Sequence, residues 1–173
     1  NYKELIRVEH LECKTKSDSE VLIRLYQKYG FDFLNKLNGM FSFCIYDMKK
    51  ELYFCARDRY GKKPFFYYFK DKKFIFSSSI KSILNLLDYK PNLNKVAVSK
   101  YMQYFVSFGE DTFYQDIYKL ESATYMIYEP NKPFELQKKK YYKINTYKAI
   151  KDEKQALTDI EELLIKSVEY RLN

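Results

Sequence analysis

Residues 40–57 read Met-Phe-Ser-Phe-Cys-Ile-Tyr-Asp-Met-Lys-Lys-Glu-Leu-Tyr-Phe-Cys-Ala-Arg, two apolar runs on either side of a polar turn. Two further aromatic runs, at 64–69 and 74–78, flank a second polar turn at 70–72. Short runs of this composition, bounded by turn residues, are typical of β-strands. Both faces of these runs are apolar, so we expect the sheet that they form to be covered on both sides.

Helical and strand-like patterns continue on both sides of these runs. Ser17 and Glu20 have the spacing of a capping box, and Gly30 closes the apolar stripe that follows. The predicted elements are helices at 1–9, 18–29 and 31–37, from 80 to before Pro91, from 92–94 to 105 and from 153 onward, and strands at 13–15, around 123–128 and at 134–142.

The composition indicates a folded chain. Hydrophobic residues make up 46% of the 173 residues and aromatic residues 19%, too many for a disordered tail. The longest apolar runs are much shorter than the ~20 residues of a membrane span, and no basic-then-apolar leader opens the chain. We therefore expect a soluble, cytoplasmic globular protein without a membrane partner.

The formal net charge is +8, and most of the positive charges are scattered lysines. The densest run, Lys138–Lys140, is followed by Tyr141 and Tyr142. This pattern fits either a patch that binds phosphates and stacks on bases or an edge strand protected by lysines. The scattering of the lysines favours the edge strand, so we expect no nucleic-acid partner.

The three cysteines do not form a metal-binding pattern, because no two have CxxC spacing and the chain has a single histidine. If the hairpin turns near residues 49–50, Cys44 and Cys55 face each other across the strands. We expect them to be buried thiols. Cys13 close to His10 allows a nucleophile-and-base pair, but simple packing is the favoured interpretation.

The composition changes near residue 145. Residues 145–152 are a polar connector, and an amphipathic helical stripe follows, which must be buried against another surface. The chain begins at Asn1 without an initiator Met. We therefore expect it to be part of a longer protein, with one domain at 1–144 and the start of a second at 145–173.

Three motifs occur in order along the chain: Ser17-Asp18-Ser19-Glu20-Val21, then residues 37–43 (LNGMFSF), then residues 56–64 (ARDRYGKKP). Together they resemble the glutaminase half of glutamine-hydrolysing asparagine synthetases, which typically reads S-D-[ST]-E-V, L-N-G-M-F-A-F and A-R-D-R-x-G-x-K-P. The similarity continues at 76–84, 112–113, 117–120 and 141–142, and so covers nearly the whole chain.

The resemblance implies the fold and the activity. The implied fold is α+β: an incomplete four-layer α/β/β/α sandwich of the N-terminal nucleophile hydrolase type over residues 1–144, followed at 145–173 by the linker and first helix of an ATP-dependent synthetase domain. Such enzymes release ammonia from L-glutamine and use ATP and Mg²⁺ to convert L-aspartate to asparagine, AMP and pyrophosphate. A homodimer is one option for their assembly.

The resemblance implies few site residues within the chain. The catalytic cysteine, the oxyanion hole and the pyrophosphate motif S-G-G-x-D-S are expected outside residues 1–173. No catalytic, cofactor-binding or metal-binding residue is therefore assigned, and the chain alone is expected to be inactive. Asp18 matches the aspartate that pairs with the α-ammonium of glutamine. Its alternative role is to complement the positive end of its own helix, worth ~0.3–1 kcal/mol.

The charged cluster Arg57, Asp58 and Arg59 matches a structural turn of the family, and we assign it no catalytic role. Two departures stand out: Ser79 replaces the usual Glu, and residues 120–125 (LESATY) replace L-P-P-G-H-Y. They leave open an asparagine-synthetase-like amidotransferase with another ammonia acceptor. The basic composition leaves a second alternative, a non-catalytic basic domain that binds nucleic acid.

Overall fold

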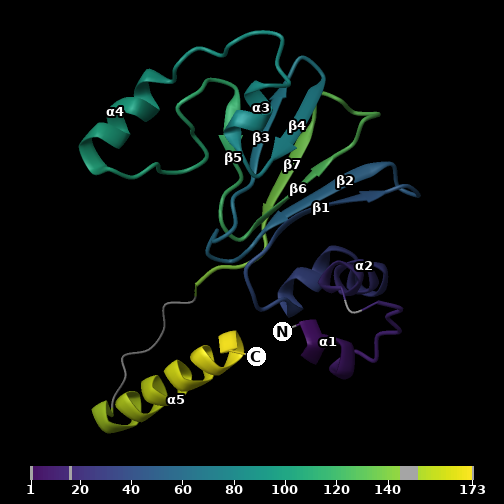
Figure 1. Ribbon diagram of the computed structural model, residues 1–173, viewed down its shortest axis with the longest axis vertical. Coiled ribbons are helices and arrows are strands. Elements are labelled where there is room, and N and C mark those ends of the chain that lie inside the picture. The colour runs from purple at the N-terminus through teal and green to yellow at the C-terminus, as the bar shows by residue number, and fades with distance from the viewer. Residues whose placement is uncertain (1, 16, 145–151, 173) are drawn as a thin grey trace.

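The computed structural model describes residues 2–15, 17–144 and 152–172, and these form an α+β fold with two antiparallel sheets (Figure 1). The elements in chain order are α1 (Tyr2–Val8), α2 (Asp18–Tyr29), the 3-10 helix η1 (Gly30–Lys36), β1 (Ser42–Asp47), β2 (Leu52–Arg57), β3 (Phe66–Lys70), β4 (Lys73–Ser77), α3 (Ile80–Leu84), α4 (Lys95–Tyr104), β5 (Ile117–Lys119), β6 (Thr124–Tyr128), β7 (Leu136–Lys140) and α5 (Glu153–Leu172).

The four apolar runs form strands as predicted, but they belong to two sheets and not to one. The first sheet has the order β1-β2-β6-β7 and the second the order β4-β3-β5 (Figure 1). The short strand β5, only three residues long, was not predicted. The β1–β2 hairpin pairs Cys44 with Cys55 as expected. Both are free thiols, and burial raises the pKa of Cys55 well above its usual range.

Apolar side chains cover both faces of both sheets. The first cluster lies between the helices α1, α2 and η1 and the first sheet, around the fully buried Phe54. The ring of Phe54 lies 4.8 Å from that of Phe31 and 5.6 Å from that of Tyr26, measured between centroids. The second cluster, with Cys55, Phe65, Tyr67, Leu120 and Met126, lies between the sheets. The third joins Tyr68 and Ile117 of the second sheet to Ile83 of α3.

Helix α2 begins where the capping motif predicts, but Glu20 serves a different purpose. The Ser17 side chain caps the helix by accepting from the backbone N–H of Ser19. Glu20 does not close a capping box. Its carboxylate accepts from the backbone N–H groups of Lys14 and Thr15, at 2.9 and 2.7 Å, and from the Thr15 hydroxyl at 2.6 Å. The predicted strand at 13–15 is therefore wrong, because these N–H groups bind a side chain in place of a neighbouring strand.

The Glu20 bonds predict how stability depends on pH. They lower the pKa of Glu20 from 4.5 to about 2, with the Thr15 hydroxyl as the largest cause. A carboxylate whose pKa is lower in the folded chain stabilises the fold above its unfolded pKa, and this contribution is lost as the pH falls toward 2. We expect Glu20→Gln to flatten the fall in unfolding free energy between about pH 5 and pH 2. Denaturant titrations across this range measure it, with Glu162→Gln on α5 as the matched control. Equal pH profiles for Glu20→Gln and wild type would contradict the expectation.

A buried charged turn connects β2 of the first sheet to β3 of the second. Arg57 is 8% exposed, and its guanidinium donates to three backbone carbonyls: Lys63 at 2.7 Å, Gly61 at 2.6 Å and Leu120 at 2.6 Å. Burial lowers the pKa of Arg57, but the three carbonyls satisfy the cation. The side chain thus holds the turn closed and ties it to the segment before β6.

The negatively charged side chain of Asp58 also stabilises this turn, and it is only 1% exposed. Its carboxylate accepts from the backbone N–H groups of Tyr60, Lys62 and Lys63, at 3.1, 2.9 and 3.0 Å. Its own backbone carbonyl accepts from the N–H of Ala123. Ala123 has a left-handed backbone, with φ 56°, in the segment that departs from L-P-P-G-H-Y. The hydrogen bonds of Arg57 and Asp58 give both charged side chains a structural role, which agrees with the structural turn that the resemblance implies.

Gly61 offers a direct test of how tightly this turn is built. Its φ is +64°, and a Cβ added there would lie 3.1 Å from Cζ of Arg57. Gly61→Ala should lower the free energy of unfolding by about 2–4 kcal/mol, through backbone strain and crowding. Gly109→Ala is the matched control, because Gly109 has φ +61° and no atom within 4 Å of an added Cβ. It should cost about 1–2 kcal/mol. Equal losses of stability for Gly61→Ala and Gly109→Ala in urea titrations would contradict this expectation, because the Arg57 guanidinium would then move aside without cost.

The remaining helices follow the predicted pattern with shifted ends. Helix α3 is shorter than expected, and Ser79 at its start makes no side-chain capping bond. Asn94 caps α4 by accepting from the N–H of Ala97. The predicted connector falls largely on residues 145–151, outside the described residues. Within the described ranges, no helix has both the length and the apolar character needed to cross a membrane.

Candidate functional site

Asp18 lies at the first position of α2, where Ser17 caps the helix, and its side chain is exposed. It lines a cavity of about 200 Å³. The other lining residues come from α1, α2 and the segment between η1 and β1: Tyr2, Leu5, Val21, Leu22, Leu37, Asn38, Gly39, Met40 and Phe41. The structure therefore places Asp18 both at the positive end of a helix and at the wall of a cavity, so its position is compatible with both interpretations.

The wall of this cavity is mostly apolar. Among its side chains, only Asp18 carries a carboxylate, and Asn38 supplies an amide. Small-ligand sites commonly combine an apolar wall with a few polar groups that fix orientation. A carboxylate at this position can form a charge-assisted hydrogen bond with a cationic ligand group such as an ammonium. The size suits a ligand as small as an amino acid.

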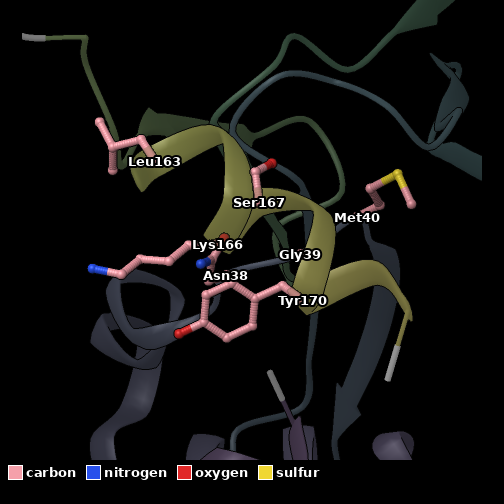
Figure 2. A pocket seen from close by; sticks show the side chains of 7 residues that line it. All are labelled: Asn38, Gly39, Met40, Leu163, Lys166, Ser167 and Tyr170. Carbon is pink, nitrogen blue, oxygen red and sulfur yellow. The ribbon is translucent and has the colours of Figure 1, made fainter. Parts of the chain in front are cut away.

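A second, larger cavity adjoins the first. It measures about 630 Å³ and is lined by Asn38, Gly39 and Met40 on one side and by Leu163, Lys166, Ser167 and Tyr170 of α5 on the other (Figure 2). Asn38, Gly39 and Met40 line both cavities, and we call these three residues the shared wall. The LNGMF motif contains the shared wall, but sequence reasoning gave it no role in a site. Nor did it anticipate that α5 would face this segment.

The structure does not assemble the other candidate chemistry. Cys13 packs against the apolar cluster of α1, α2 and η1, which agrees with the packing interpretation. Lys138–Lys140 belong to β7, which is the last strand of the first sheet, as the edge-strand interpretation predicted. The two tyrosines after it are engaged: the Tyr141 hydroxyl donates to the Arg57 carbonyl, and the Tyr142 ring lies against Arg59. Among the described residues, no three His, Cys, Asp or Glu side chains form a group that could hold a metal ion.

The motifs, Asp18 and the turn at residues 57–64 lie in a part of the chain that matches a known domain family. Residues 1–142 match the family described as "Glutamine amidotransferase domain". The chain is therefore a member of the glutamine amidotransferase domain family, and its α+β fold with antiparallel sheets is compatible with that assignment.

Individual relatives show which members of this family the chain is similar to. The chain is 40% identical to "Putative asparagine synthetase [glutamine-hydrolyzing] 2" of Methanocaldococcus jannaschii, over 99% of this chain and 34% of that protein. It is 28% identical to "Asparagine synthetase [glutamine-hydrolyzing] 1" of Bacillus subtilis, over 99% of this chain and 27% of that protein. It is also 29% identical to "Amidase chry2" of Gibberella zeae, over 90% of this chain and 23% of that protein. The similarity to glutamine-hydrolysing asparagine synthetases is thus confirmed, and the chain spans about a third of the length of the first of these relatives.

Proposed function

We propose that this chain is the glutamine-binding part of a glutamine-hydrolysing asparagine synthetase. The observation that carries the proposal is Asp18, an aspartate of the S-D-S-E-V motif at the wall of a small apolar cavity, in a chain of the amidotransferase family. In this proposal the Asp18 carboxylate accepts hydrogen bonds from the α-ammonium of L-glutamine. The side-chain amide is then hydrolysed by a cysteine nucleophile that another part of the protein supplies.

The proposed domain organisation follows the same division. Residues 1–144 form part of a four-layer α/β/β/α sandwich of the N-terminal nucleophile hydrolase type. The order of the three apolar clusters, from helices to first sheet to second sheet to α3, supports this arrangement. Residues 145–173 form the linker and first helix of an ATP-dependent synthetase domain, in support of which the family match ends at residue 142.

The parent protein then carries out the complete reaction. Ammonia released from glutamine amidates aspartate, with ATP and Mg²⁺ supplied to the synthetase domain, and the products are asparagine, AMP and pyrophosphate. The described residues offer no group of His, Cys, Asp or Glu for the metal ion, so no step in this chain is assigned to it. The isolated chain is proposed to be inactive, and the parent to work in the cytoplasm, with a homodimer as one option for its assembly.

An isotope experiment tests the proposal. The parent protein is incubated with ATP, Mg²⁺, aspartate and glutamine labelled with ¹⁵N in the side-chain amide. We expect the label in the amide of asparagine, with glutamate and AMP formed in equal amounts. The departures at Ser79 and residues 120–125 leave one alternative open, transfer of the ammonia to a different acceptor. Glutamine hydrolysis without label in asparagine would support that alternative, and no glutamine hydrolysis at all would contradict both.

A further inference from the structure

Arg59 makes contacts that the proposed function does not use. Its Nη2 donates to the backbone carbonyl of Asn35 at 3.0 Å, and its guanidinium carbon lies 4.7 Å from the centre of the Tyr142 ring. Its Nε is buried without a hydrogen-bond partner among the residues that the structure describes. A guanidinium held against an aromatic face is stabilised by the ring electrons, more so where water is excluded. The position of this cation therefore depends on the ring of Tyr142.

The two partners of Arg59 come from distant parts of the chain. Asn35 lies near the end of η1, three residues before the shared wall begins at Asn38. Tyr142 follows β7 and is where the chain leaves the first sheet. Its neighbour Tyr141 is fixed as well, because its N–H donates to the Ala123 carbonyl and its hydroxyl to the Arg57 carbonyl, both at 2.8 Å. Arg59 thus connects the exit of the chain to the segment that leads into the shared wall.

Helix α5 lies on the other side of the shared wall, across the larger cavity. Beyond Tyr142 the chain continues to α5, four residues of which line the larger cavity together with the shared wall: Leu163, Lys166, Ser167 and Tyr170 (Figure 2). In Figure 1 the C-terminal end of α5 likewise points back toward α1 and α2. The shared wall therefore lies between the Asp18 cavity and α5.

We propose that Arg59 is a positioning residue that clamps the chain exit at Tyr142 to the segment that leads into the shared wall, and so holds the wall of the Asp18 cavity in place. This inference rests on the proposed function for its effect on glutamine, but the clamp itself does not. Arg59 does not touch the ligand in this account. Loss of the clamp should let the shared wall move relative to the first sheet, which weakens glutamine binding more than it slows the chemical step.

A matched pair of substitutions at Tyr142 separates the clamp from simple packing. Tyr142→Phe keeps the aromatic face, whereas Tyr142→Leu keeps an apolar side chain without one. In the parent protein, we expect Tyr142→Leu and Arg59→Met to raise the KM for glutamine by about three- to tenfold, with kcat changed less than about twofold. Tyr142→Phe should match wild type. Equal KM values for the Phe and Leu variants, or an unchanged KM in Arg59→Met, would overturn the proposal.

Amide hydrogen exchange on the parent protein tests the clamp without relying on activity. Tyr142→Leu should speed exchange in residues 35–41, and Tyr142→Phe should not. Unchanged exchange in the Leu variant would overturn the clamp even if glutamine is hydrolysed. Faster exchange in a parent protein that hydrolyses no glutamine would support the clamp and contradict the proposed function. If Arg59→Met fails to fold, the Tyr142 pair still decides.

Discussion

Asp58→Ala should lower the free energy of unfolding by about 3–5 kcal/mol, the largest loss of stability that we expect from a single substitution in this chain. The substitution removes the acceptor for three backbone N–H groups, those of Tyr60, Lys62 and Lys63. It also leaves the buried guanidinium of Arg57 without its neighbouring negative charge. Because the turn joins the two sheets, its opening should affect the packing of both.

Urea titrations measure this loss of stability, and two control variants are compared with Asp58→Ala. Asp58→Asn keeps one acceptor oxygen and the shape of the side chain, so it should cost less, about 1–3 kcal/mol. Asp88→Ala removes a carboxylate that is 90% exposed and forms a surface ion pair with Lys73, so it should stay within about 0.5 kcal/mol of wild type. A loss in Asp58→Ala no larger than that of Asp88→Ala would contradict the structural role of the turn.

Asp18→Asn should raise the KM for glutamine by about 10- to 100-fold in the parent protein, the largest effect that we expect on function. The amide keeps the shape of the side chain but removes the negative charge that we propose pairs with the α-ammonium, and hydrogen bonds to charged groups are worth about 1.5–3 kcal/mol. Amidation from free ammonia should stay within about twofold of wild type, because it bypasses the glutamine site. Steady-state kinetics with each nitrogen source measures both.

The control for this substitution is Asp32→Asn, an exposed aspartate on η1 that does not line the Asp18 cavity. It should leave both activities near wild type. Equal losses of the glutamine-dependent and ammonia-dependent activities in Asp18→Asn would assign Asp18 a structural role, as the complement of the helix end.

Local patterns predicted the elements that depend on neighbouring residues. The Ser17 cap and Gly30 bound α2 correctly, and the polar turn at 47–51 sets the register that pairs Cys44 with Cys55. Pairing over long distances was not predictable in this way. Strand β6 pairs with β2, and β5 pairs with β3, although other elements separate each pair along the chain. A short apolar run indicates a strand but not its partner, so the runs alone did not show that these four strands lie in two sheets.

For the candidate site, too, the sequence predicted single residues but not the arrangement that the tertiary fold produces. The motif around Asp18 was sufficient to select this residue as a ligand-binding candidate. The cavity beside it is formed by residues of α1, α2 and the shared wall, which only the tertiary fold brings together. Glu20 is a further example: the spacing to Ser17 predicted a capping box, but its carboxylate found three donors in the preceding loop. Competition between several nearby backbone groups for one side chain cannot be judged from spacing alone.

The most direct test of the central claim, that Asp18 binds the α-ammonium of glutamine, compares two substrates in two proteins. The substrates are L-glutamine and glutaramate, which has the same side-chain amide without the amino group. Wild-type parent protein should prefer glutamine by about 10- to 100-fold in kcat/KM, and Asp18→Asn should reduce this preference to nearly one. The same preference in both proteins would contradict the account, because the group that recognises the ammonium would then lie elsewhere.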